Sequence, residues 1–456
     1  MLSFDYVCIE CGRTYAVEPD RCLCDACSVH QTPDQPLRGQ LEVRLAGDAP
    51  ADWAALRASG GRVGIPVAPA ESWPSRAPFA DSRALMPVPQ GAFPPIPVGE
   101  TPLWAPARIR TELDRPGLFL KDDTANPTGS LKDRASYLVA AFAVHHGLPD
   151  IVVASTGNAG SSMAGVAAAA GLNVRLYLPA SAPPAKIVQA MQYGADVIKV
   201  DGTYDAAFDA SLAYVAEHGG LSRNTAHNPL TVEGKKSVSL EMFRQLGASV
   251  PDVVYVPTGD GVILSGVCKG FEDLVTLGLA AQVPEVVSVQ AEGSAALARA
   301  LARTADTAGG ALSVDGASAS GGEPVVRHGM SVSGPGASFA DDFANLAGAF
   351  GSPVPARTVA DSISVDVPRG GYYALQRLVR HGGRCVAVSD EAVISAQRRL
   401  SSSSGLFAEP AASAAFAGLL ADLEAGRGPG RGDRAVVLLT GSGLKDIAAA
   451  MKGVEA

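Results

Sequence analysis

The hydrophobic pattern of the chain consists of short apolar runs, each followed by a loop of small residues and then by a helical pattern. The runs at 151–154, 253–256 and 436–439 are apolar at nearly every position. Strands of this kind are buried on both faces, as in a parallel sheet. The repeated order of strand, glycine-containing turn and helix predicts a doubly wound α/β protein. Ligands bind such sheets at the carboxyl ends of the strands, so the loops after these runs are candidate binding loops.

The same pattern divides the chain into segments. We expect a Cys-rich element at 1–40, a Pro-rich arm at 41–98 and a core at 99–456, with a smaller α/β subdomain at roughly 135–215. Between 304 and 355 the periodicity is lost and small residues dominate, which predicts a mobile insertion, with a lid as the alternative. The pattern also predicts the following elements: short strand 41–45, short helix 51–57, strands 118–121, 174–179, 195–200, 286–291 and 385–388, helix 204–218, and a helix capped by Ser389 or Asp390.

Composition excludes several classes of function. The 456 residues carry a formal net charge of −9 without a basic stripe, so nucleic acid is not expected as the main partner. No apolar run approaches the roughly 20 residues that span a bilayer, and no basic segment followed by an apolar one begins the chain. We therefore expect a cytoplasmic protein of two or three domains without a membrane partner.

Five of the seven cysteines lie within the first 27 residues. Two Cys-x-x-Cys pairs, Cys8 with Cys11 and Cys24 with Cys27, have the spacing of a zinc knuckle or ribbon, and Cys22 is left over. Four thiolates fill the coordination sphere of Zn²⁺, so the predicted role of the metal is structural. A metal-free thiol cluster or a disulfide pair is the alternative, although disulfides are rare in cytoplasmic proteins.

The stretch 126–134, Asn-Pro-Thr-Gly-Ser-Leu-Lys-Asp-Arg, places a lysine at the mouth of a helix. Its first four residues favour a tight turn, and an apolar helical pattern follows Asp133. Backbone N–H groups converge at such a helix start and bind anions, and a lysine among small polar residues suits Schiff-base chemistry. The alternative, from these residues alone, is an ordinary capping turn with Ser130 as the cap and Lys132 in solvent.

This stretch resembles the cofactor-lysine motif of the threonine synthase family, which belongs to the tryptophan-synthase-β-like (fold type II) pyridoxal-phosphate enzymes. Leu131 stands where phenylalanine is usual. Further motifs of that family are resembled, in the family's order, by the stretches at 99–103, 155–158, 223–236, 258–261 and 440–446. The resemblance implies an α/β fold of type II with two doubly wound open-sheet domains and a small zinc-ribbon-like element at the N-terminus.

The resemblance also implies roles for single residues. Lys132 would carry the cofactor and shuttle protons, Asn158 would touch the cofactor's ring hydroxyl, and Thr440 would hydrogen-bond the pyridine nitrogen. Asp260 departs in charge from the asparagine often found in the phosphate loop. The candidates are, for the cofactor phosphate, Thr258, Gly259, Asp260, Gly261, Val262 and Ile263; for the substrate α-carboxylate, Ser155, Thr156, Gly157, Asn158 and Ala159; and for the substrate side chain, Lys186, Asn224 and Arg369.

The activity implied is the pyridoxal-phosphate-dependent conversion of O-phospho-L-homoserine and water to L-threonine and phosphate, by a homodimer with structural zinc. No cation for the substrate phosphate has decisive spacing, so two other reactions of the superfamily remain open. These are β-replacement on O-phosphoserine or a similar amino acid, as in cysteate-synthase-like relatives, and serine/threonine dehydration. Outside enzymes, the alternative is a scaffold with a dead catalytic core, against which the intact Lys132, Asn158 and Thr440 argue.

Overall fold

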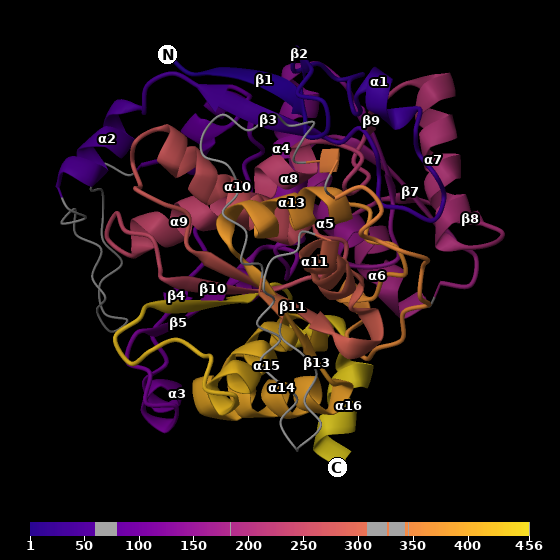
Figure 1. The fold of residues 1–456 in the computed structure, drawn as a ribbon. Helices are drawn as coiled ribbons and strands as arrows, with labels where there is room; N and C mark the ends of the chain where they lie inside the picture. Colours follow the sequence, from indigo (N-terminus) through magenta and orange to yellow (C-terminus); the bar gives the residue numbers. More distant parts are fainter. Residues whose placement is uncertain (60–79, 183, 308–325, 328–342, 345, 456) are drawn as a thin grey trace.

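Three sheets organise the chain in the computed structural model, which describes residues 1–59, 80–182, 184–307, 326–327, 343–344 and 346–455. Their strand orders are β2-β1-β3, β12-β13-β11-β10-β14-β5-β4 and β8-β7-β6-β9. Figure 1 shows the three-stranded sheet at the top, the seven-stranded sheet in the lower half and the four-stranded sheet at the right.

The strands are β1 (Ser3–Cys8), β2 (Thr14–Tyr15), β3 (Leu41–Ala46), β4 (Leu103–Trp104), β5 (Leu118–Asp122), β6 (Asp150–Ala154), β7 (Asn173–Pro179), β8 (Asp196–Val200), β9 (Leu221–Ser222), β10 (Val253–Pro257), β11 (Glu285–Ala291), β12 (Val326–Arg327), β13 (Arg384–Val388) and β14 (Ala435–Leu439). The α-helices are α1 (Asp25–Ser28), α2 (Ala51–Ala58), α3 (Ala107–Glu112), α4 (Lys132–His145), α5 (Asn158–Ala170), α6 (Pro184–Gln192), α7 (Tyr204–His218), α8 (Leu230–Lys235), α9 (Ser237–Gln245), α10 (Val262–Thr276), α11 (Ala296–Thr307), α13 (Gly371–His381), α14 (Asp390–Ser404), α15 (Pro410–Glu424) and α16 (Ile447–Glu455). The predicted strands and the helix at 204–218 are confirmed, and Ser389 is the cap of α14.

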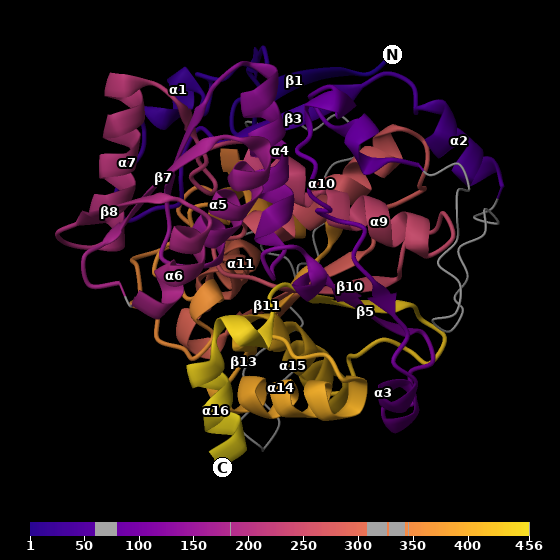
Figure 2. The ribbon, with the colours of Figure 1, turned by 180° about the vertical axis from the view of Figure 1, so that it is seen from behind.

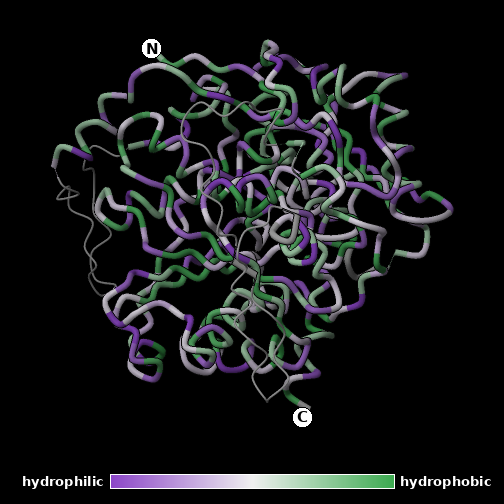
Figure 3. The backbone as a smooth tube through the Cα atoms, viewed as in Figure 1, coloured by the Kyte–Doolittle hydropathy of each residue, from purple (hydrophilic) through white to green (hydrophobic). Residues whose placement is uncertain are grey.

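The seven-stranded sheet is parallel except at its two edges, where β12 and β4 run antiparallel. Alternate side chains of a strand point to opposite faces of the sheet, and in the central strands the side chains on both faces are buried. Val254 and Val256 join the core under α10, whereas Val253 and Tyr255 join the core under α15. Figures 1 and 2 show α14, α15 and α16 together on one side of this sheet, and hydrophobic segments recur along its strands in Figure 3.

The four-stranded sheet is parallel throughout, with β6 between β7 and β9. Helix α7 packs on one face of it, and α4 and α5 lie on the other. Two open, doubly wound sheets are therefore present, as predicted. The carboxyl ends of β5, β6, β9, β10 and β14 lead directly into the loops that the sequence singles out.

The N-terminal sheet ties the cysteine-rich element to the core. Strand β3 was predicted as part of the arm that begins at residue 41, but it pairs antiparallel with β1 along its whole length and so belongs to this sheet. Glu42 on β3 forms a buried ion pair with Arg377 of α13 and accepts a hydrogen bond from Tyr373 at 3.1 Å. The predicted helix near 51–57 is confirmed as α2.

The predicted insertion at 304–355 lies largely outside the described residues. Its described ends pack on the core: the rings of Phe343 and Phe350 meet Tyr372 edge-on, at centroid distances of 5.0 and 5.4 Å. Within the described ranges, none of the helices combines the length and the apolar character needed to cross a membrane.

Candidate active site

The lysine loop is built against the loop that follows β14. The N–H of Leu131 donates to the carbonyl of Thr440 at 2.8 Å, and the N–H of Ser442 donates to the carbonyl of Gly129 at 2.9 Å. Lys132 is the first residue of α4, and Thr440 is buried. Two motifs that lie far apart in the sequence are thus joined by backbone hydrogen bonds into one unit.

A buried charged network lies beneath this unit and fixes its position. We call it the base network; its members are Lys121, Asp123, Arg134 and Glu241. Arg134 Nε lies 2.6 Å from Asp123 Oδ2, and Lys121 Nζ lies 2.7 Å from Glu241 Oε2. Because Arg134 is two residues after Lys132 on the first turn of α4, the network sets where that helix begins.

Lys132 itself has no partner. No hydrogen bond or ion pair to its Nζ exists within the described part of the chain, and the side chain is half-buried. Burial lowers the pKa of its ammonium group, which outweighs the attraction of the Asp260 and Glu409 carboxylates. A lowered pKa enlarges the neutral, nucleophilic fraction of the amine, as Schiff-base chemistry needs.

The alternative of a simple capping turn is wrong. The residue before α4 is Leu131, and no side chain caps the helix; the Ser130 hydroxyl is buried without a partner. Thr128 and Asp133 close the loop instead, since the N–H of Thr128 donates to Asp133 Oδ2 at 2.7 Å.

The loop after β6 presents backbone donors. Ser155 Oγ accepts from the N–H groups of Gly157 and Gly160, at 3.2 and 3.0 Å. The N–H groups of Thr156, Asn158 and Ala159 donate to no atom of the described residues. These donors lie at the N-terminus of α5, where the helix dipole favours an anion, so they suit a carboxylate.

Glu409 is a site residue that the sequence analysis missed. It is buried, and its carboxylate accepts from Asn158 Nδ2 at 3.0 and 3.2 Å. An added Cβ at Gly441 would lie 2.5 Å from Glu409 Oε1, so the glycine makes room for this carboxylate. Burial raises the pKa of Glu409, and the Asn158 hydrogen bond lowers it. In the sequence, the Glu409-Pro410 pair at the start of α15 was the signal that could have pointed to this carboxylate. Its role, however, depends on a contact with Asn158 of α5.

The loop after β10 combines glycines with the start of α10. Gly261 has φ +89°, and an added Cβ at Gly259 would lie 2.7 Å from the backbone of Ile363. Asp260 turns its carboxylate onto the helix start, where Oδ1 accepts from the N–H of Val262 at 3.1 Å. The N–H groups of Gly259, Gly261 and Ile263 have no partner among the described residues, so they suit a phosphate group.

Replacing Gly261 with alanine is expected to lower cofactor affinity by at least about 10-fold, because the positive φ is strained for alanine and the new Cβ would lie 2.8 Å from Ala374 Cβ. Bound cofactor, measured by absorbance after dialysis, checks this. Gly171→Ala is the matched control, since Gly171 also has a positive φ, +68°, but nothing within 4 Å of the added Cβ. Equal cofactor loss in both variants would contradict the assigned role.

Two of the three candidates for the substrate side chain, Asn224 and Arg369, already have partners within the protein. Asn224 Oδ1 accepts from the N–H of Ala154, and Asn224 Nδ2 donates to Ser211 Oγ, both at 2.7 Å. Arg369 pairs with Asp205 of α7 and stacks over Phe208 at 3.8 Å from the ring centroid. The side chain of Lys186 lies outside the described residues.

Two buried cations near Lys132 were not predicted. Arg223 follows β9 directly, and Lys235 is the last residue of α8; both are fully buried. Arg223 lowers the pKa of Lys132, and Lys132 in turn lowers that of Lys235. A charged residue directly after a buried strand was the signal in the sequence, although strand β9 is only two residues long.

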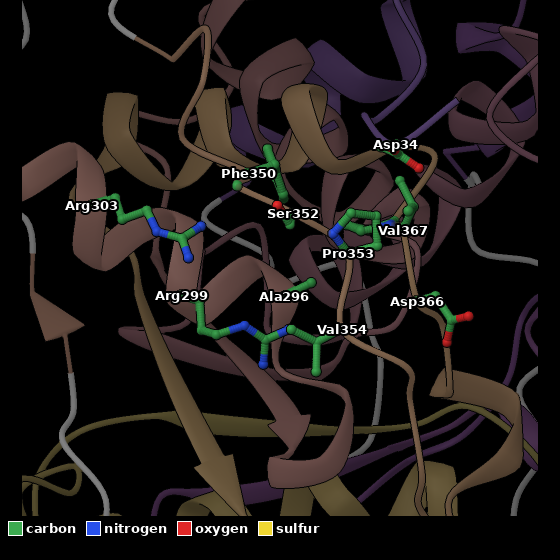
Figure 4. Close-up of a pocket in the computed structure, with 12 residues that line it drawn as sticks. Asp34, Ala296, Arg299, Arg303, Phe350, Ser352, Pro353, Val354, Asp366 and Val367 are labelled. Atoms are coloured by element: carbon green, nitrogen blue, oxygen red, sulfur yellow. The ribbon is translucent and has the colours of Figure 1, made fainter. Parts of the chain in front are cut away.

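The pocket in Figure 4 is separate from this site. It lies between α11 and the segments at 350–354 and 366–368, and is lined in part by Arg299 and Arg303. Its volume of about 20 Å³ admits little more than one water molecule, so neither a cofactor nor an amino acid fits there.

The cysteine cluster lies in the N-terminal element. The sulfur atoms of Cys8, Cys11, Cys24 and Cys27 all lie within 4.8 Å of one another. Cys11 Sγ and Cys24 Sγ are 3.8 Å apart, which matches the edge of about 3.8 Å that a tetrahedron with Zn–S bonds of about 2.3 Å has. The donor set therefore fits a structural zinc ion, and all seven cysteines are free thiols.

Comparisons with known proteins agree with this geometry. Residues 96–441 match the family model described as "Pyridoxal-phosphate dependent enzyme". The threonine synthase of Methanocaldococcus jannaschii is 31% identical over 78% of this chain and 78% of its own length. The threonine synthase of Mycobacterium bovis is 29% identical over 85% of this chain and 93% of its own length.

Solved structures share the fold at lower identity. Threonine deaminase isoform 2 from Solanum lycopersicum superposes with a TM-score of 0.60 at 17% identity, over 86% of this chain and 98% of its own. Maize serine racemase superposes with a TM-score of 0.60 at 18% identity, over 79% of this chain and 93% of its own. A partnerless lysine amine, glycines that leave room for a phosphate and unused N–H groups at the start of α10 fit the group that the family binds. The chain belongs to the pyridoxal-phosphate dependent enzymes of fold type II.

Proposed function

We propose that the protein converts O-phospho-L-homoserine and water into L-threonine and phosphate with the help of pyridoxal phosphate. The observation that carries the proposal is the amine of Lys132, which has no partner among the described residues. The carboxylates that act on it are Asp260, in the loop before α10, and Glu409, which accepts from Asn158 of α5. Relatives named threonine synthase, which match this chain over most of its length, support the choice of substrate.

Each group of residues has a separate role in this proposal. When bound, pyridoxal phosphate supplies an electron sink for the electrons left at the substrate Cα. The loop at 258–263 would hold its phosphate, Thr440 its pyridine nitrogen and Asn158 its ring hydroxyl. The N–H groups of the loop at 155–159 would hold the substrate α-carboxylate.

The balance of the reaction defines the role of Lys132. The Cγ–O bond to phosphate breaks, Cβ loses one proton and Cγ gains one, the hydroxyl of water bonds to Cβ, and the remaining proton of water goes to the released phosphate. In this proposal Lys132 takes the proton from Cα and moves protons at Cβ and Cγ. Asn158 is oriented by Glu409, which holds its amide nitrogen.

Two reactions of related enzymes are the alternatives. β-Replacement on O-phosphoserine would use the same cofactor residues and a phosphorylated substrate, and we rank it second. Serine/threonine dehydration would leave the buried cations Arg223 and Lys235 without an anion. Two observations argue against a dead scaffold: Glu409 accepts from Asn158 and acts electrostatically on Lys132, and the lysine loop is hydrogen-bonded to Thr440.

A substrate panel tests the proposal. The purified holoenzyme would be given O-phosphohomoserine, O-phosphoserine, serine and threonine, with phosphate release and product identity as readouts. We expect threonine and phosphate in equal amounts from O-phosphohomoserine and no keto acid from serine or threonine. A holoenzyme that leaves O-phosphohomoserine untouched but consumes O-phosphoserine would replace the proposal by β-replacement.

We also propose that the four-cysteine cluster holds one structural zinc ion. Cys24→Ser is expected to lose the metal and to lower the thermal midpoint, because a structural zinc contributes directly to folding. Metal content by mass spectrometry checks this. Cys22→Ser is the control and should keep one zinc per chain, since Cys22 lies outside the group of four. A wild-type protein without zinc, at full thermal stability, would refute the site.

We further propose a cytoplasmic homodimer, as the resemblance implies. Light scattering of the holoenzyme should give twice the mass of the chain. A mass equal to one chain would refute the dimer.

A further inference from the structure

Two buried cations form no ion pair with a carboxylate in the part of the chain that the structure describes, although Asp260 acts on both electrostatically. Nine lysine and arginine side chains are buried among the described residues. Seven form an ion pair with a carboxylate: Lys121, Arg134, Lys236, Arg244, Lys269, Arg377 and Arg384. Arg223 and Lys235 form none within the described ranges. A buried cation without an anion is costly, so these two are candidates for binding an anion that the chain does not supply.

Arg223 is held beside the catalytic lysine. Its N–H donates to the carbonyl of Val152 on β6 at 2.8 Å, and its Nε donates to Ser136 Oγ at 3.3 Å. Ser136 is four residues after Lys132 on α4, and therefore on the same face of the helix. Nη1 donates to Thr225 Oγ1 at 2.7 Å, whereas Nη2 is buried without any partner. The guanidinium is thus fixed in place with a donor left over.

Lys235 approaches the same region from α8. Its Nζ donates to the carbonyl of Thr231 at 2.9 Å and to no other described atom, which leaves two of its three protons unused. Its Cβ would lie 2.7 Å from a Cβ added at Gly266, so it packs against the first turns of α10. Burial lowers its pKa, and the charges of Lys132 and Arg223 lower it further, so the three cations act on one another.

We infer that Arg223, assisted by Lys235, binds the side-chain phosphate monoester of the substrate. The inference rests on the proposed function and assigns a residue to the part of the substrate for which no cation has decisive spacing in the sequence. A phosphate dianion accepts charge-assisted hydrogen bonds, and the unused Nη2 of Arg223 carries two N–H groups that can donate to it.

The count of anions supports this assignment. A phosphorylated amino acid and the cofactor together bring a cofactor phosphate, an α-carboxylate and a side-chain phosphate. The glycine loop with the start of α10 accounts for the first, and the loop at 155–159 accounts for the second. Arg223 and Lys235 form a third donor set, which an unphosphorylated substrate such as serine would leave unused.

Binding of inorganic phosphate to the holoenzyme tests the inference, because the cofactor already fills its own phosphate site. Calorimetry would compare wild type, Arg223→Gln and Arg223→Lys. Each variant would also be assayed for KM with O-phosphohomoserine, for cofactor content and for thermal midpoint. Arg384→Gln is the matched control, since Arg384 is equally buried but pairs with Asp422 and with Glu285.

Arg223→Gln is expected to weaken phosphate binding by about 10- to 100-fold, with a similar rise in KM. Arg223→Lys should show a smaller loss of phosphate affinity, because lysine keeps the positive charge but lacks the planar guanidinium with its several N–H donors. Both variants should keep full cofactor content and the thermal midpoint of wild type. Arg384→Gln should do the reverse, with a lower midpoint and unchanged phosphate binding.

Unchanged phosphate binding in Arg223→Gln would overturn the inference. Cofactor loss in that variant would also overturn it, because the guanidinium would then serve the cofactor phosphate. The proposed function fails separately: wild type that binds phosphate through Arg223 but does not convert O-phosphohomoserine would keep the subsite and exclude the reaction. Conversion at an unchanged KM by Arg223→Gln would keep the reaction and exclude the subsite.

Discussion

Lys132→Ala is expected to lower the rate of phosphate release from O-phosphohomoserine by roughly 1,000-fold or more, because one amine both carries the cofactor and moves protons. The loss should fall on kcat, with the cofactor either released or bound without its covalent link. The measurement is initial phosphate release, together with the absorbance of the bound cofactor. Since Lys132 has no ion pair in the described chain, its removal should leave the thermal midpoint of the cofactor-free protein near that of wild type.

Lys452→Ala is the matched control, because Lys452 is an exposed lysine on α16. It should change neither the rate nor the absorbance. A Lys132→Ala variant that releases phosphate at more than about one tenth of the wild-type rate would refute the assignment of the catalytic amine.

Glu241→Gln is expected to destabilise the fold by about 3–5 kcal/mol, because it leaves the buried Lys121 without a carboxylate and removes one of the two carboxylates that pair with Arg134. Glu241 lies 2.7 Å from Lys121 Nζ, and Arg134 Nη2 donates to its Oε2 at 2.8 Å. Urea unfolding at pH 7 measures the loss. Glu217→Gln, whose side chain is 78% exposed, should change stability by less than about 0.5 kcal/mol.

The same residue predicts a pH dependence. Arg134 and Lys121 hold the pKa of Glu241 well below its ordinary value of 4.5, against the opposing effect of burial. A carboxyl with a depressed folded pKa stabilises the protein above its unfolded pKa, and the stabilisation is lost as the pH falls through 4.5 towards the folded value. Wild type should therefore lose stability more steeply than Glu241→Gln below pH 4.5. Parallel curves would show that this carboxylate does not contribute.

Local residue chemistry was enough to predict the fold class and to select most loops of the candidate site. The runs that became β6, β10 and β14 are apolar at nearly every position, which only strands buried on both faces require. Glycines at 259 and 261 are needed wherever a backbone approaches a phosphate closely. The spacing of the four cysteines depends only on the geometry of a tetrahedral metal.

Other site residues could not be found this way. Asn224 and Arg369 are polar residues near the right strands, but their side chains are engaged by Ser211 and Asp205. Glu409 precedes α15, and its contact with Asn158 joins segments far apart in the sequence. Whether a polar side chain is used or unused depends on its neighbours in space, which sequence spacing does not report.

The sequence by itself determined the two parallel sheets, the cysteine cluster and the lysine at a helix start, because periodicity, turn chemistry and ligand spacing are local properties. Only the tertiary structure decided that Lys132 forms no ion pair within the described residues, that Glu409 orients Asn158, and that Arg223 is buried with a donor unused by any described residue. Whether a charge is buried and paired depends on which distant segments meet at the edge of the sheet where the strands end. At that edge a buried cation without a partner favours binding of an anion, because its desolvation is otherwise uncompensated.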